Sequence, residues 1–278
     1  NRDFLFNGKV KGGRLDFFGS DFYFSYDDFK ISLNKIDSLR LKVPDGEPDD
    51  RGRQRIRAVK TVLRDLKGEL LVDRPDNKSG LVNHTRYPLF NSTDDSFVYY
   101  DKRSIQDGEY NKEEFYMHLV PFSIDSLENF TKEGLAFDGN FVSAGIFPDF
   151  DETLTLQPDF SLGFVRETPS EGLAMFGGKG NYKATIKLSH DGLRGDGNIE
   201  YLTSVAQSED FIFYPDSVNG IAQDYVIAKQ EIPVAYPPVK GIAVKVHWEP
   251  KLDHFYSYKL DNPFDMYEGE VAHHGGLD

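Results

Sequence analysis

Short runs of alternating apolar and polar residues, separated by glycine and aspartate, constrain this chain more than any other feature. The alternation is clear in residues 183–188 and 241–248, as expected for strands that bury one face. Five Asp-Gly pairs, which favour tight turns, punctuate the chain: Asp45-Gly46, Asp107-Gly108, Asp138-Gly139, Asp191-Gly192 and Asp196-Gly197. We therefore predict an all-β fold with less than about 15% helix. Repeated antiparallel β-strand units would form either an open curved sheet, like a solenoid or jellyroll trough, or tandem β-sandwiches.

One segment, residues 55–66, also fits a helix. Its apolar residues Val59, Val62, Leu63 and Leu66 follow helical spacing. Valine and threonine are frequent there, however, and no capping residue precedes the segment. We therefore predict β-structure here, as a strand pair that runs into residues 68–72.

Composition limits the classes of function. Aromatic residues make up 14% of the chain, including 23 Phe and 15 Tyr, which is typical of a folded β-protein and not of a disordered one. The 46 acidic residues outnumber the 32 basic ones, and the resulting net charge of −14 disfavours nucleic acid as a partner. The chain contains no cysteine, which excludes disulfides, thiolate nucleophiles and cysteine-ligated metals. No apolar run approaches the roughly 20 residues that span a bilayer as a helix.

The distribution of polar residues predicts two β-repeat regions. The first, residues 1–165, carries long polar insertions at residues 44–54 and 74–96. The second is residues 166–278. The segment 232–238 has three prolines and marks a boundary or a bend in an edge strand.

Internal repeats are the strongest long-range signal. Gly8 and Gly197 are each followed, at the same distance, by an Asp-Phe-x-Phe run. This alignment predicts that Phe22, Phe24, Phe211 and Phe213 are equivalent positions in the apolar layer of two repeat copies. A looser third copy surrounds Gly139 and leads to residues 153–156. Such units cannot bury their apolar faces alone and must stack on neighbours.

A second pattern recurs near the C-terminus. Residues 175–178 (Met-Phe-Gly-Gly) are echoed by residues 266–269 (Met-Tyr-Glu-Gly). Because this second copy is cut short at Asp278, and because residues 1–6 read as the middle of a strand, we predict that the chain is a fragment that begins and ends inside repeats of a longer protein.

Residues 187–217 carry a resemblance to known proteins. The run from Leu188 to Ser204, followed by Asp210-Phe211-Ile212-Phe213, resembles repeats of large envelope proteins of Gram-negative bacteria. These proteins are distantly similar to the AsmA-like and translocation-and-assembly-module families, and to the OstA-type β-jellyroll of lipopolysaccharide transport. The resemblance implies an open, curved sheet whose apolar inside holds lipid chains, in an exported protein of the periplasm or outer membrane. It supplies no catalytic residues, and the polar insertions between Pro44 and Ser96 depart from its pattern.

No motif for catalysis, cofactor binding or metal binding stands out. Gly177-Gly178-Lys179-Gly180 lacks the ending of a phosphate-binding loop and is expected to form a tight turn. His247 and Glu249 share one strand face, but we expect them to be exposed polar residues and not ligands of a zinc ion. The acidic stretches 45–50 and 149–152 lack EF-hand spacing and are expected to be solvated loops. We therefore predict no catalytic residues, no cofactor and no metal.

Three functions remain open. The favoured one is a non-enzymatic module of a bacterial envelope protein, acting as a scaffold or lipid-transfer trough in outer-membrane assembly. Its partners would be other envelope proteins, neighbouring repeats of the same chain, or lipid. The alternative is a surface adhesin or glycan-binding β-sandwich array, with Trp248, Tyr256 and Tyr258 as sugar-stacking candidates. The third and least favoured is a β-rich hydrolase.

Overall fold

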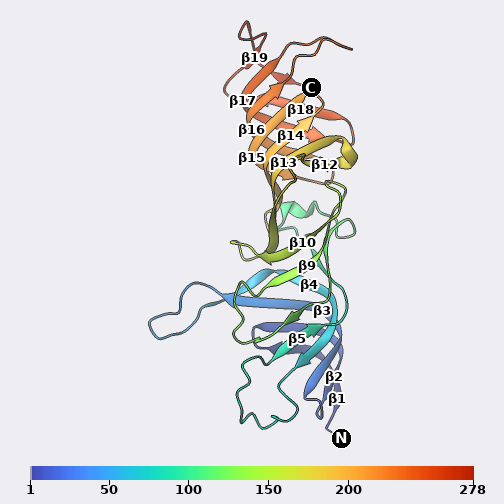
Figure 1. The fold of residues 1–278 in the computed structure, drawn as a ribbon, viewed down its shortest axis with the longest axis vertical. Coiled ribbons are helices and arrows are strands. Elements are labelled where there is room, and N and C mark those ends of the chain that lie inside the picture. The colour runs from blue at the N-terminus through green and yellow to red at the C-terminus, as the bar shows by residue number, and fades with distance from the viewer. Residues whose placement is uncertain (1) are drawn as a thin grey trace. The chain divides into compact units, whose positions relative to one another are not determined.

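The computed structural model describes residues 2–278, and it is almost entirely β-structure, with 57% strand and 2% helix. The predictions of an all-β fold and of a low helix content are therefore confirmed. The chain divides into two compact units, and each of them contains one strongly curled, open antiparallel sheet (Figure 1). Unit 1 holds residues 2–100, 116–141 and 150–164, and unit 2 holds residues 101–115, 142–149 and 165–278. The units are thus interleaved in sequence, whereas the sequence predicted two continuous regions.

Unit 1 begins with four long strands in consecutive hairpins and ends in shorter ones. The long strands are β1 (Phe4–Gly12), β2 (Leu15–Ser25), β3 (Lys30–Pro44) and β4 (Ile56–Leu71). The shorter strands are β5 (Leu89–Ser92), β6 (Ser96–Tyr99), β8 (Ser123–Ile124) and β10 (Phe150–Leu156). Three further strands have residues in both units: β7 (Phe115–Leu119), β9 (Ala136–Ser143) and β11 (Leu162–Glu167). β5 lies inside the predicted polar insertion 74–96, where its backbone pairs with β4.

β4 explains why its sequence also fits a helix. Alternate residues are buried from Val59 to Leu63, and again from Leu66 onward. Between them Asp65 adopts a φ of 59°, and the register of the β3–β4 pairing shifts in this strand. This irregularity moves the apolar positions from a spacing of two to a spacing of three, which imitates helical periodicity. The prediction of β-structure is confirmed, but the segment forms one continuous strand, not the predicted strand pair.

Unit 2 is a meander in which β12 to β17 each pair with the next strand in the chain. These strands are β12 (Leu173–Met175), β13 (Gly180–Ser189), β14 (Gly192–Tyr201), β15 (Ser204–Phe213), β16 (Val218–Ile227), β17 (Val239–Glu249) and β18 (His254–Lys259). Short strands complete the edge: β19 (Phe264–Met266), β20 (Val271–His273) and β21 (Gly276–Leu277). Two short 3-10 turns are η1 (Gln106–Gly108) and η2 (Phe176–Gly178). Aromatic side chains are prominent in the core of unit 2, where Trp248 is fully buried against Phe176, Tyr201 and Phe255.

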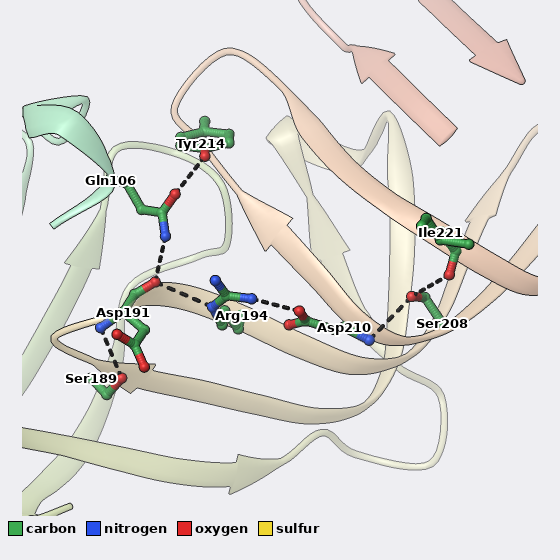
Figure 2. A network of polar contacts seen from close by, with 8 residues as sticks. All are labelled: Gln106, Ser189, Asp191, Arg194, Ser208, Asp210, Tyr214 and Ile221. Atoms are coloured by element: carbon green, nitrogen blue, oxygen red, sulfur yellow. Dashed lines mark hydrogen bonds and ion pairs between the residues drawn. The ribbon is translucent and has the colours of Figure 1, made fainter. Parts of the chain in front are cut away.

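Polar side chains connect the β13–β14 turn with neighbouring segments of unit 2 (Figure 2). Arg194 binds the Asp210 carboxylate at 2.5 Å and the Asp191 carbonyl oxygen at 3.2 Å. The Gln106 side-chain amide donates to the same carbonyl at 2.7 Å, and it accepts a bond from the Tyr214 hydroxyl at 2.6 Å. These contacts fix the β13–β14 turn and segment 101–115 of unit 2. Their role in this segment is structural.

The first repeat is visible in the register of two hairpins. In β1–β2, Gly8 lies opposite Gly19 and Phe6 opposite Phe22. In β14–β15, Gly197 lies opposite Ser208 and Gly195 opposite Phe211. The numbering offset between the hairpins is constant, and each hairpin shifts register at the same place, just before its central glycine. The repeated strand organisation is therefore present in the structure. The looser copy around Gly139 has another register, with Gly139 opposite Glu152.

The second repeat also has a shared geometry. Met175 lies opposite Gly180, and Met266 lies opposite Val271, so both methionines close loops of the same length. All three residues that follow each methionine have positive φ: 48°, 69° and 90° after Met175, and 55°, 58° and 97° after Met266. The copies differ at the middle position of the turn, where Gly177 in the first corresponds to Glu268 in the second.

Glu268 is therefore a place where the chain is strained and its sister repeat is not. A side chain in the left-handed region costs about 1–2 kcal/mol, and glycine avoids that cost. We expect Glu268→Gly to raise the free energy of unfolding by about 0.5–1 kcal/mol, measured by chemical denaturation. Glu270→Gly is the matched control, because Glu270 lies outside the run of positive φ. Glycine there adds backbone freedom to the unfolded chain, so this substitution should destabilise the protein. A loss of stability in Glu268→Gly would contradict the repeat alignment.

Candidate apolar ligand pocket

The four phenylalanines predicted to form an apolar layer lie in the two repeated hairpins. Phe22 on β2, and Phe211 and Phe213 on β15, are fully buried, while Phe24 on β2 is partly exposed. Phe22 packs edge-on against Phe6 with ring centroids 5.6 Å apart. None of the four lines the pocket described next, so they contribute to packing.

A pocket of about 570 Å³ opens in unit 2 where several strand ends meet. Apolar and aromatic side chains provide most of its lining: Tyr201, Leu202, Tyr225, Ile227, Tyr236, Pro237, Val239, Phe255, Met266, Tyr267 and Leu277. Thr203, Ser204, Asp253 and Asp278 supply the polar part of the lining. The turns that follow β14 and β19 and the ends of β16 and β18 bring these residues together. The volume lies in the range of small-molecule sites.

One wall of the pocket is a stack of three rings. Phe255 lies between Tyr201, at 5.4 Å and an interplanar angle of 9°, and Tyr225, at 6.2 Å and 13°. Trp248 supports this stack from the core, with its ring 5.0 Å from Tyr201 and 6.1 Å from Phe255. The wall is therefore held in place by packing before any ligand binds.

The proline-rich segment forms the facing part of the lining. Gln230 and Tyr236 exchange two backbone hydrogen bonds, of 3.0 and 3.2 Å, which close the loop between β16 and β17. The Tyr236 hydroxyl also donates to the Gln230 side-chain oxygen at 3.1 Å and is hydrogen-bonded to the Thr203 hydroxyl. The segment predicted as a boundary or an edge bend is thus a loop that contributes Tyr236 and Pro237 to the pocket.

Two tyrosines of the pocket, Tyr201 and Tyr225, have a raised pKa and are neutral. Burial raises the pKa of Tyr225, and the nearby hydroxyls of Ser257 and Ser204 offset this only in part. Burial also raises the pKa of Tyr201, with a further contribution from the Asp253 carboxylate. The carboxylate of Asp253 is exposed and lies 2.6 Å from the Lys179 ammonium group. The lining therefore combines mainly apolar surface and hydroxyls with the carboxylates of Asp253 and Asp278, and its apolar part favours an apolar ligand.

A second hollow, of about 490 Å³, lies on the outer face of β16 to β18. Asn219, Lys245, His247, Tyr256 and Tyr258 line it. His247 is hydrogen-bonded through Nδ1 to the Asn219 side-chain oxygen at 2.6 Å and is roughly parallel to the Tyr256 ring. Of the three aromatic residues singled out in the sequence, Tyr256 and Tyr258 lie here, whereas Trp248 lies in the core.

The other residues considered in the sequence form no site. Gly177 to Gly180 make a tight turn, as predicted, in which Lys179 binds the Pro250 carbonyl. In the first acidic stretch, Asp45 pairs with Arg55 and Asp49 pairs with Arg53. The second stretch is not a loop, because Asp151 and Glu152 belong to strand β10. Among residues 2–278, no group of three or more His, Asp or Glu side chains is placed to hold a metal.

Comparisons with family models, curated proteins and solved structures give no match. Within the described part of the chain, no helix is long and apolar enough to cross a membrane. Inference about function therefore depends on the geometry of the chain itself.

Sequence reasoning missed the pocket residues for a physical reason. Tyr201, Tyr236 and Phe255 are far apart in the chain, and each lies at or near the end of a strand, where alternation no longer predicts which way a side chain points. A partial signal was available, because two tyrosines and a phenylalanine next to turn residues are unusual in loops that face only solvent.

Proposed function

We propose that this chain is a non-enzymatic binding module of an exported bacterial envelope protein, and that its curled sheet holds an apolar ligand such as a lipid acyl chain. The observation that carries the proposal is the pocket of unit 2, with its ring stack and its aliphatic lining. The resemblance of residues 187–217 to envelope repeats supports a scaffold or lipid-transfer role in the periplasm or outer membrane. Other envelope proteins and neighbouring repeats of the same chain would be its partners.

The chemistry of the lining favours an acyl chain over a polar metabolite. A polar ligand needs several convergent hydrogen-bonding groups, and burying its polar atoms without partners costs free energy. The hydroxyl groups of Tyr201, Thr203 and Tyr236 are already hydrogen-bonded within the protein. Apart from the carboxylates of Asp253 and Asp278, most of the surface that remains for a ligand is apolar. Burial of apolar surface contributes about 25 cal/mol per Å².

Ile227 and Val226 provide a matched test. Ile227 lines the pocket, whereas its neighbour Val226 points outward from the same strand and is 41% exposed. We expect Ile227→Glu to weaken binding of an apolar fluorescent dye and of a fatty acid at least tenfold, about 1.4 kcal/mol, because a carboxylate would be desolvated by the ligand. Val226→Glu should bind as the unmodified protein does. Equal binding by both variants, with folding confirmed by circular dichroism, would contradict the proposal.

A glycan-binding site on the outer face is the second candidate function. Tyr258 is 54% exposed there, and His247, Asn219 and Lys245 offer polar groups around the hollow, the combination of ring face and hydrogen-bonding groups that suits a sugar. Tyr258→Ala should lower affinity for a bound oligosaccharide about tenfold, equivalent to about 1.4 kcal/mol, in a glycan-array or calorimetric assay. The same variant should leave binding of the apolar dye unchanged, while Ile227→Glu should leave glycan binding unchanged. No binding across a broad glycan array would remove this candidate.

A further inference from the structure

The first strand of unit 1 has a free edge. Among residues 2–278, β1 pairs only with β2, so the backbone groups on its other edge have no strand partner. Its first residues are also unusually apolar for an edge strand, with Phe4 53% exposed and Leu5 70% exposed. Exposed edges of this kind favour pairing with another strand, and soluble proteins ordinarily protect them with charge, proline or a bulge. The register shift before Gly8 and the lysines Lys9 and Lys11 protect the second half of β1, whereas Phe4 to Phe6 carry no charge and no proline.

The repeated hairpin of unit 2 shows what such an edge can hold. β14 corresponds to β1, and it is flanked on both sides, by β15 and by β13. β13 runs antiparallel to β14, with Leu188 opposite Leu193 and Ala184 opposite Gly197. Leu193, the counterpart of Phe4, is fully buried. The position is therefore buried in the repeat that has a neighbouring strand, where Tyr110 also contacts it, and exposed in the repeat that has none.

The space beside the central glycine also differs between the two repeats. A methyl group added to Gly197 would lie 2.1 Å from the Lys183 carbonyl oxygen of β13. A methyl group added to Gly8 would meet no atom within 4 Å. The space that β13 occupies beside Gly197 is thus open beside Gly8.

We infer that the free edge of β1 is a docking site for an extended polypeptide strand that pairs antiparallel with it, as β13 pairs with β14. The occupant would carry apolar side chains at alternate positions, because Tyr182, Ile186 and Leu188 of β13 are all fully buried on one face. Backbone hydrogen bonds provide the affinity of such a complex, and the alternate apolar side chains determine its register. This interaction surface is independent of the ligand pocket in unit 2.

A graft tests the inference on the full chain. Residues 180–192, which comprise β13 and its turn, would replace the three residues that precede Phe4, so that Gly192 takes the place of Asp3 as the repeat alignment requires. We expect amide hydrogen exchange along β1 to slow by about tenfold or more, with no change in unit 2. A control with one glycine inserted before Phe4 shifts the register by one residue and turns the apolar face outward, so it should give no protection.

The same strand as a free peptide gives a second readout on the unmodified protein. Protection of β1 amides by saturating peptide of residues 180–192, and no protection by a peptide of the same composition in scrambled order, supports the inference. Unchanged exchange along β1 with both the in-register graft and the peptide would overturn it. Protection of β1 that rises with protein concentration and accompanies a dimer would also overturn it, because the occupant would then be β1 of a second copy.

Discussion

Trp248→Ala is expected to lower the free energy of unfolding of unit 2 by about 3–5 kcal/mol, the cost typical of removing a large aromatic side chain from a packed core. Trp248 is completely buried on β17 and contacts the rings of Phe176, Tyr201 and Phe255. A methyl group added to Gly180 would lie only 2.5 Å from the indole ring, so the glycine makes room for it. Truncation would leave a large cavity behind the ring stack. Chemical denaturation followed by circular dichroism measures the loss.

Trp248→Phe separates packing from hydrogen bonding at the same site. The indole Nε1 is buried and has no hydrogen-bond partner in the structure of residues 2–278, so phenylalanine removes no such bond. We expect this variant to lose about 1–2 kcal/mol, much less than the alanine variant. Because Trp248 is the single tryptophan of the chain, its fluorescence in the unmodified protein also reports unfolding. An alanine variant within 1 kcal/mol of the original would show that this core tolerates a cavity.

The packing around Trp248 also links stability to the proposed function. Tyr201 and Phe255 each contact Trp248 on one side and line the ligand pocket on the other. Loss of the indole should therefore loosen the ring stack and weaken dye binding in the variant that remains folded. An aromatic core is a source of rigidity here, and a rigid pocket loses less entropy when a ligand binds.

Local patterns predicted the strands well because side-chain alternation is a property of each strand alone. The lone ambiguity, in β4, arose where an irregularity at Asp65 changed the spacing of the apolar residues. The alignment of Gly8 with Gly197 also reached beyond local structure, since the two hairpins share their register and the place where it shifts. Two copies of a repeat share their turn lengths as well as their apolar positions. The strand register of one copy can therefore be inferred from the other once the repeat is recognised.

Tertiary assembly was harder to predict from the same sequence. Residues 101–115 belong to unit 2 because the buried Tyr110 hydroxyl donates to the Phe213 carbonyl at 2.9 Å and accepts from the Leu193 amide at 3.0 Å. Burial raises the pKa of Tyr110, so the hydroxyl remains protonated and can make both bonds. A single tyrosine hydroxyl that bridges β14 and β15 from a distant segment produces no periodic pattern in the sequence. The pocket was missed for the same reason, as its residues meet only after the sheet has curled.

Gly197→Ala is expected to lower the free energy of unfolding by about 2–3 kcal/mol. The new methyl group would lie 2.1 Å from the Lys183 carbonyl oxygen and 2.9 Å from the Ala184 methyl group, both on β13. A backbone oxygen in a paired strand cannot move away without disturbing the hydrogen bonds between β13 and β14. The substitution should therefore lower stability and speed amide exchange along β13. Asn198→Ala, at the next residue of β14, is the matched control and should change stability by less than about 0.5 kcal/mol, because the Asn198 side chain lies on the partly exposed face.

Gly8→Ala distinguishes steric from conformational cost at the equivalent repeat position. Gly8 has open space around it but a φ of 119°, which a residue with a side chain rarely adopts. We expect Gly8→Ala to lower the free energy of unfolding by about 1 kcal/mol through backbone strain alone. Amide exchange along strand β2 should not change. If Gly197→Ala proved as mild as Gly8→Ala, β13 would not be held tightly against β14, and the occupied edge could no longer serve as the template for the open one.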